Sequence, residues 1–192
     1  MLGRTLSLSL PAWVADWPEP DPLACTDDRM RAVLGLAKRN VEEGSGGPFA
    51  AGVFERESGR LVSIGVNRVL PENNSLAHAE ILALGLAHAT AGTFDLGEPG
   101  RPRLQLVSSS QMCAMCLGAV VWSGVSEVVY ASTTADVVGT VGFDEGPMPL
   151  DYAEQLLRRG ISVLPQVLRE EGVKVLQRYV AVGGVVYNAH HG

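Results

Sequence analysis

The chain has 192 residues, of which 46% are hydrophobic and 19% charged, and its formal net charge is −6. This length and composition suffice for one domain with a sizeable buried core. The excess of acidic residues excludes nucleic acid as the expected partner, because binding to phosphate backbones depends largely on Lys and Arg. No apolar run approaches the roughly 20 residues that span a bilayer, so we expect no membrane-spanning helix.

Residues 1–25 carry four prolines and two tryptophans, a composition that predicts an arm and not a regular helix or central strand. Because Trp13 and Trp17 are costly to leave in water, we expect the arm to pack on the body of the domain or on a partner subunit. Its apolar residues alternate with serines and stop at Pro11, so we expect no signal peptide.

From residue 26 onward, apolar periodicity and turn signals alternate between helix and strand. In chain order we expect a helix over 26–43, a hairpin of strands 49–54 and 61–66, a helix beginning at His78, a strand over 104–107, a helix opened by Cys113, a strand over 127–131, a loop over 137–146, a helix over 152–159, a strand over 161–164 and a helix over 167–179. This alternation predicts a three-layer α/β domain with a mixed sheet.

Three candidate metal ligands occur in two short motifs, His78-Ala79-Glu80 and a Cys-x-x-Cys formed by Cys113 and Cys116. An imidazole nitrogen and two thiolates suit Zn²⁺, and three protein ligands leave the fourth tetrahedral position open for water. Both motifs are expected at the first turn of a helix, where the positive helix end favours thiolates and backbone N–H groups are free. The pattern predicts one catalytic zinc ion.

Glu80 stands two residues after the histidine, a spacing typical of zinc nucleobase deaminases, in which this glutamate moves protons and does not bind the metal. The signature lacks only its proline, because Met112 precedes Cys113. A redox-active cysteine pair or inert cysteines are the alternative. Cys25 stands alone, so the chain has no fourth ligand at structural-site spacing and no further cysteine pair for a disulfide, which fits a cytoplasmic protein.

Several further motifs make the sequence resemble the guanine deaminase branch of the cytidine-deaminase-like superfamily. The resemblance runs from about Met30 to Asn188 and rests on Gly47-Pro48-Phe49, Asn67-Arg68-Val69, His78-Ala79-Glu80, the run from Cys113 to Ala119, Trp122 and Gly142-Phe143-Asp144-Glu145. It implies an α/β/α fold with a five-stranded mixed sheet, and a deaminase domain over 26–192 preceded by the arm 1–25. It also implies one Zn²⁺ per subunit and a homodimer whose C-terminal segment, exchanged or not, covers an active site.

The resemblance also assigns roles to individual residues. It implies that zinc is bound by His78, Cys113 and Cys116, and that Glu80 is the proton shuttle with Glu145 as a second one. It implies that the base is bound by Asn67 and the backbone N–H of Ala79. The pocket is then formed by Phe49, Phe143 and Trp122 and closed by Tyr187. The residues alone leave simpler readings open: Asn67 as a turn cap, Glu145 as a solvated charge and Trp122 as core packing. His190 and His191 are read as tail residues.

One departure from the family pattern concerns the residues before Cys113, where Gln111-Met112 replaces the usual Glu-Pro. The lost negative charge is expected to alter the basicity of the water or the substrate preference. We therefore expect a zinc-dependent aminohydrolase of a small-molecule nucleobase, with guanine first and ammeline as a further substrate. The alternatives are isocytosine, a cytosine analogue or another triazine as substrate, and a catalytically silent zinc-bound interaction protein.

Overall fold

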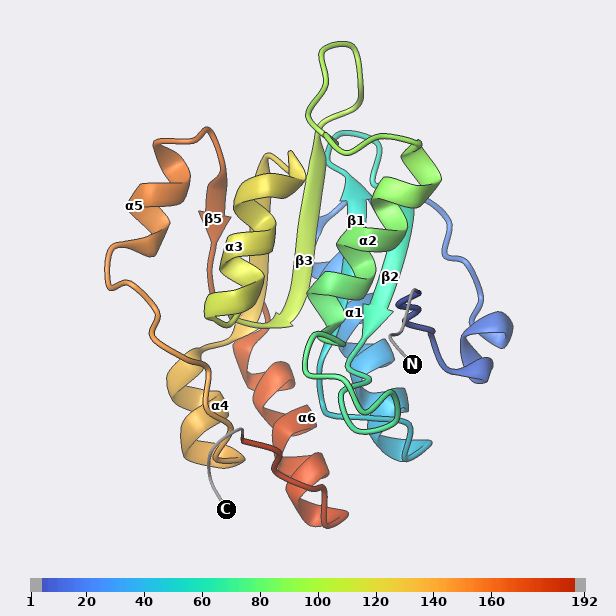
Figure 1. Ribbon diagram of the computed structural model, residues 1–192, viewed down its shortest axis with the longest axis vertical. Helices are drawn as coiled ribbons and strands as arrows, with labels where there is room; N and C mark the ends of the chain where they lie inside the picture. The colour runs from blue at the N-terminus through green and yellow to red at the C-terminus, as the bar shows by residue number, and fades with distance from the viewer. Residues whose placement is uncertain (1–4, 189–192) are drawn as a thin grey trace.

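A computed structural model describes residues 5–188 and contains a five-stranded sheet with helices on both faces (Figure 1). The strand order is β2-β1-β3-β4-β5. The strands are β1 Ala50–Glu55, β2 Leu61–Val66, β3 Leu104–Ser110, β4 Glu127–Ser132 and β5 Ser162–Leu164. β1 runs antiparallel to both β2 and β3, whereas β3, β4 and β5 are parallel. The expected α/β/α fold with a five-stranded mixed sheet is confirmed.

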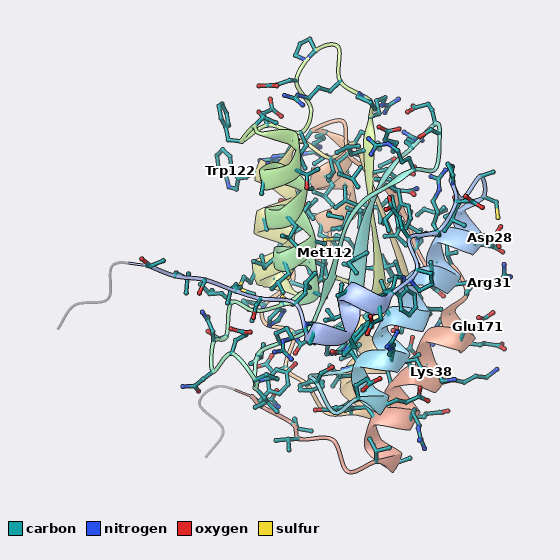
Figure 2. The ribbon with its side chains drawn as sticks, turned by 90° about the vertical axis from the view of Figure 1, so that its right-hand side faces the viewer. Asp28, Arg31, Lys38, Met112, Trp122 and Glu171 are labelled. Atoms are coloured by element: carbon teal, nitrogen blue, oxygen red, sulfur yellow. The ribbon has the colours of Figure 1, made fainter. Side chains whose placement is uncertain are left out.

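The helices divide between the two faces of the sheet, as the two views show (Figures 1 and 2). They are η1 Ala12–Asp16, α1 Thr26–Glu42, α2 Ala79–Ala91, α3 Ala114–Ser123, α4 Thr134–Thr140, α5 Tyr152–Leu157 and α6 Arg169–Ala181. α2 and α3 cover one face, and α1 and α6 cover the other. Two adjacent helix N-termini, those of α2 and α3, therefore lie on the same side of the sheet.

The alternation of side chains along the central strands explains why both faces need helices. Leu106 and Val128 belong to the apolar core under α2 and α3, whereas Val107 and Val129 belong to the core under α1 and α6. All seven residues of β3 and all six of β4 are buried. Strands of this kind are stable only when both faces are covered.

The structure corrects three expectations about local structure. Residues 134–140 form α4 where the sequence indicated a loop from residue 137, because Thr133 and Asp136 form a capping box that begins a helix. The arm contains the short 3₁₀-helix η1, which starts directly after Pro11. β3 extends through Ser110, because the serine hydroxyls at its end find buried hydrogen-bond partners.

Within residues 5–188, no helix combines the length and the apolar character needed to cross a membrane. His190 and His191, expected as tail residues, lie outside the described residues.

Candidate active site

The metal-ligand motifs meet at the ends of two helices beside the carboxyl end of β3. His78 is the N-cap of α2, and Cys113 is the N-cap of α3. Cys116 lies on the first turn of α3 and is fully buried. Because capping residues are fixed by the backbone that follows them, this arrangement holds the three side chains in a defined geometry.

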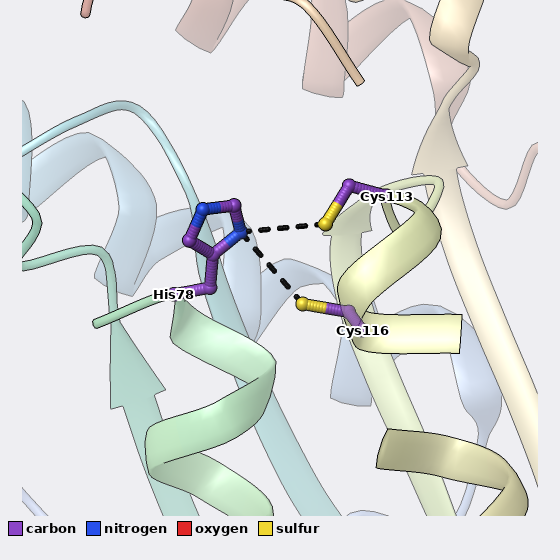
Figure 3. A group of neighbouring side chains, drawn as sticks. All are labelled: His78, Cys113 and Cys116. Carbon is purple, nitrogen blue, oxygen red and sulfur yellow. Dashed lines mark hydrogen bonds between the residues drawn. The ribbon is translucent and has the colours of Figure 1, made fainter. Parts of the chain in front are cut away.

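The three side chains point toward one another, as Figure 3 shows. Nδ1 of His78 lies 3.5 Å from Sγ of Cys113 and 3.7 Å from Sγ of Cys116. Each residue offers one ligand atom, and these atoms all lie within 4.8 Å of one another. Hydrogen bonds from Cys116 and His78 lower the pKa of Cys113 to about 4 despite its burial. One imidazole nitrogen and two sulfurs that a dication would hold as thiolates form a donor set that fits Zn²⁺.

Glu80 lies beside the ligand cluster without belonging to it. Its carboxylate accepts a hydrogen bond from Ser108 Oγ at 3.1 Å, and its Oε2 is 3.5 Å from Sγ of Cys116. The side chain is 6% exposed, and this burial raises its pKa above the ordinary value for glutamate. A buried carboxylate of raised basicity next to the metal ligands can accept and return a proton.

A small cavity of about 170 Å³ opens beside His78. Three aromatic rings contribute to its walls: the ring centroid of Phe143 lies 5.4 Å from that of Phe49 and 4.6 Å from that of Tyr187. The lining residues are Phe49, Val69, Ser75, His78, Phe143, Asp144, Glu145, Tyr187 and Asn188. Flat apolar walls with a few polar groups are typical of a site for an aromatic ring.

Asn67 is buried next to this cavity and is not one of its lining residues. Its Oδ1 accepts hydrogen bonds from the backbone N–H groups of Gly47 at 3.4 Å and Val69 at 3.3 Å. The hydroxyl of Tyr187 lies nearby: a Cβ atom on Gly47 would be 2.7 Å from that hydroxyl and 3.0 Å from Asn67 Oδ1. Only glycine at position 47 leaves room for both polar groups.

The C-terminal segment lines part of the cavity through Tyr187 and Asn188. Asn188 Oδ1 accepts from the backbone N–H of Asp144 at 2.8 Å, and its Nδ2 donates to the carbonyl of Gly142, also at 2.8 Å. Tyr187 has a buried hydroxyl with no hydrogen-bond partner within residues 5–188. Glu145 lines the cavity from the clamped loop, and burial together with the negative charges of Cys113 and Glu80 raises its pKa to about 8.

Residues 24–132 match the family model described as the cytidine and deoxycytidylate deaminase zinc-binding region. The match covers more than half of the chain and includes all three metal ligands. The chain belongs to this deaminase family.

Known members resemble this deaminase over most of its length. Guanine deaminase of Bacillus subtilis (strain 168) is 33% identical over 116 residues, which make up 60% of this chain and 69% of that protein. A solved structure of the guanine deaminase from Nitrosomonas europaea is 45% identical, has a TM-score of 0.88 and aligns over 94% of this chain and 99% of its own. A structure of NE0047 in complex with 2,6-diaminopurine is 47% identical, with a TM-score of 0.89 over 96% of this chain and 97% of that one. These similarities place the deaminase in the guanine deaminase branch.

One expected pocket residue lies elsewhere in this deaminase. Trp122 is 84% exposed and points away from the sheet (Figure 2). It follows Cys116 by six residues, which on an α-helix means a different face and roughly 9 Å along the axis. Trp122 therefore does not line the cavity beside the metal ligands, and within the chain it does not form core packing either.

Two residues next to the cluster were not expected from the sequence. Ser108 donates to Glu80, and Asn188 clamps the loop that carries Glu145. The run of three serines ending β3 was a signal for the first, because hydroxyls in a buried strand need partners. Nothing in the local sequence marked Asn188, because its partners are 44 and 46 residues away.

Proposed function

We propose that this protein is a zinc-dependent guanine deaminase that hydrolyses the free base and releases ammonia. The observation that carries the proposal is the cavity of about 170 Å³, which is lined by three aromatic rings and by His78 of the ligand cluster. Pockets for drug-sized ligands are typically 300–1,000 Å³. The smaller volume favours a single base over a nucleoside, and the relatives named guanine deaminase support guanine as that base.

The residues divide the work as follows. When bound by His78, Cys113 and Cys116, zinc supplies Lewis-acid activation of water at neutral pH. Glu80 takes a proton from the attacking water and delivers it to a ring nitrogen, which makes the amino-bearing carbon electrophilic. Either Glu80 or Glu145 then protonates the departing amine; the raised pKa of Glu145 lets it carry a proton near neutral pH.

The walls and the polar atoms orient the ring. Phe49 and Phe143, packed against each other, form an apolar aromatic wall for the ring. Oδ1 of Asn67 is fixed by two backbone N–H groups, which leaves its amide N–H atoms to bind a carbonyl or ring nitrogen of the base. The backbone N–H of Ala79, at the first position of α2, is a second donor because it has no acceptor within its helix.

The Gln-Met departure has a local structural role. Oε1 of Gln111 accepts a hydrogen bond from the backbone N–H of Thr134 at 3.1 Å, so this side chain caps the start of α4. Met112 is fully buried in the core under α2 and α3. Both side chains thus serve the fold around the site.

Ammonia release tests the proposal directly. The zinc-loaded protein is assayed against guanine, ammeline, isocytosine, cytosine, adenine and the corresponding nucleosides, with zinc content measured in the same sample. We expect preferential turnover of guanine and none of guanosine. Turnover of isocytosine or triazines without guanine would identify a retuned enzyme, and silence on every base with zinc bound would contradict an enzymatic role.

We also propose that the protein is a homodimer formed through the outer faces of α2 and α3. Glu80 is the only charged residue of these two helices, and it is buried. Leu86 and Trp122 are exposed on them at 39% and 84%. An uncharged apolar helix pair is typical of a surface covered by another subunit.

Light scattering after size exclusion tests this assembly, and Trp122→Glu is expected to shift it toward the monomer. A wild-type monomer at micromolar concentration would contradict the dimer. A cytoplasmic location is part of the same proposal, because none of Cys25, Cys113 and Cys116 forms a disulfide.

A further inference from the structure

The N-terminal arm is linked to the cavity by a continuous chain of hydrogen bonds. The indole N–H of Trp13, on η1, donates to Ser45 Oγ at 2.9 Å. Ser45 Oγ donates in turn to Oδ1 of Asn40 at 2.7 Å. Because each group donates to the next, the dipoles align and the bonds reinforce one another. The arm is thereby connected to α1, the helix on the opposite face of the sheet from the metal ligands.

Asn40 completes the connection to the binding residues. It is fully buried on α1, and its Nδ2 donates to the carbonyl of Gly47 at 2.8 Å and to that of Asn67 at 3.0 Å. The backbone N–H of Asn67 donates to the carbonyl of Phe49 at 2.9 Å. One amide therefore fixes both the segment that carries the cavity wall Phe49 and the residue proposed to bind the base.

Close packing leaves these residues little freedom to find other partners. A Cβ atom on Gly46 would lie 1.8 Å from the carbonyl oxygen of Asn67 and 2.8 Å from Nδ2 of Asn40. The two backbone segments thus approach at a distance that only glycine permits. A shift of the Asn40 amide moves both of them together.

The arm makes a second attachment, to the loop that follows Asn67. Ser9 Oγ donates to Glu72 Oε1 at 2.6 Å, and the same oxygen is 3.5 Å from Nη2 of Arg68. Arg68 Nη1 also donates to the carbonyl of Ser45. Val69 and Ser75, which line the cavity, belong to this second loop. The arm therefore holds both loops that form one side of the cavity.

We infer that the N-terminal arm is part of the substrate-binding apparatus, in which Trp13, Ser45 and Asn40 position Gly47, Phe49 and Asn67 for the base. This inference rests on the proposed function. None of the three touches the metal ligands or Glu80 in any recorded hydrogen bond within residues 5–188, so they act on binding and not on the chemical step. Their loss should raise KM while leaving kcat nearly unchanged.

The two tryptophans of the arm provide a matched pair of variants. Their rings pack edge to face with centroids 6.2 Å apart, but only Trp13 donates to Ser45. Trp13→Phe removes the N–H and keeps an aromatic ring, and Trp17→Phe makes the same change without touching the chain of bonds. We expect Trp13→Phe and Ser45→Ala each to raise KM for guanine about 3–10-fold, with kcat within about twofold and zinc content unchanged.

The double variant tests the connection itself. Because Trp13 acts through Ser45, Trp13→Phe/Ser45→Ala should raise KM no more than the larger single change. Trp17→Phe should leave KM unchanged. Equal KM effects from both tryptophans, additive effects in the double variant, or no change in Trp13→Phe would overturn the inference. Asn40→Asp replaces the N–H donor that faces the carbonyls of Gly47 and Asn67 by an acceptor. If this variant folds, its KM should exceed that of either single variant.

Hydrogen exchange gives a readout that needs no substrate. Trp13→Phe should speed exchange in the peptide covering residues 46–49, and Trp17→Phe should not. If the wild type fails to deaminate guanine, the proposed function fails, yet this comparison still decides whether the arm positions the loop. Unchanged exchange in Trp13→Phe would reject the positioning role even in an active guanine deaminase.

Discussion

Two groups of buried polar side chains lie at opposite ends of the parallel strands β3 and β4. At the amino ends, Arg29 donates to Gln105, Gln105 to Glu127, and Arg56 and Ser162 also bind Glu127. The remaining N–H groups of Arg29 bind the carbonyls of residues 23, 24 and 56. Every side-chain polar atom of Arg29, Gln105 and Glu127 has a partner, so this network ties the arm, the hairpin and β5 together.

The group at the carboxyl ends is organised differently. Its sulfur and nitrogen atoms face one another at 3.5–3.7 Å, and the buried hydroxyl of Tyr187 has no partner within the described residues. Buried polar groups in folded proteins are nearly always paired, and leaving one unpaired costs free energy. The comparison teaches that the two groups differ in arrangement: the first pairs all its side-chain polar atoms with one another or with the backbone, whereas the ligand atoms of the second converge on one point, as a metal site requires.

The largest expected effect is a loss of catalysis in the group at the carboxyl ends of β3 and β4. Glu80→Gln keeps the shape of the side chain but cannot accept a proton, so kcat for guanine should fall by about 10²–10⁴-fold or more. Zinc content, measured by metal analysis, should stay near one per chain, because Glu80 is not a ligand. Loss of zinc in this variant would contradict its role as proton shuttle.

The next largest effect is a loss of stability in the group at the amino ends of β3 and β4. Glu127→Ala removes the only carboxylate of the network, so that the Arg29 charge and Gln105 Nε2 stay buried without a negative partner. This change should lower the free energy of unfolding by about 3–5 kcal/mol. Urea unfolding measures this loss, while kcat at 25 °C should stay unchanged. Glu154→Ala, which breaks an exposed ion pair with Arg158, is the matched control and should change stability far less. A large loss of kcat in Glu127→Ala would show that the group at the amino ends also contributes to catalysis, which would contradict the separation of the two groups.

Two tyrosines that pack against Phe143, Tyr179 stacked and Tyr187 tilted, allow a comparison within the group at the carboxyl ends. Tyr179 donates to the carbonyl of Val185 at 2.7 Å, whereas the buried hydroxyl of Tyr187 meets no hydrogen-bond partner among residues 5–188. Tyr179→Phe should therefore cost about 1 kcal/mol of unfolding free energy, and Tyr187→Phe should cost none. Thermal unfolding measures the difference. If Tyr187→Phe destabilises the protein as much as Tyr179→Phe, its hydroxyl is structural and not reserved for ligand.

The smallest expected effect concerns the capping box of α4, the helix that precedes the Glu145 loop. Paired oxygens of Asp136 accept two hydrogen bonds from Arg169, at 2.8 and 2.6 Å, which together with the bonds of Thr133 hold the pKa of Asp136 well below its usual range. A lowered folded-state pKa contributes stability above the unfolded-state value near 3.9, and this stability is lost as the pH falls through the folded value.

Asp136→Asn should accordingly destabilise the protein by about 1 kcal/mol at pH 7, the size typical of a lost cap. The difference from wild type should shrink as the pH falls below about 4, because the wild-type carboxyl is then protonated in the unfolded chain. Urea unfolding at pH 7 and pH 3 measures both values. A difference that is independent of pH would show that the charge of Asp136 is not what stabilises α4.

The site residues that could be predicted are those whose role shows in the neighbouring sequence. His78 and the cysteines were predictable because ligand type and spacing within one helical turn carry the chemistry. Trp122 was misplaced because its helical position alone could not show which face of α3 looks outward. Asn40 was not expected at all, because a buried asparagine on an amphipathic helix gives no sign of the loop it will hold.

The sequence by itself determined the alternation of strands and helices, the metal ligands and the position of Glu80, because apolar periodicity and short motifs act over a few residues. Only the tertiary structure decided that the tail clamps the Glu145 loop through Asn188 and that Trp13 reaches Asn67 through Ser45 and Asn40. Apart from the bond between Ser45 and Asn40, these contacts join residues 27 to 46 positions apart, a separation that local periodicity does not report.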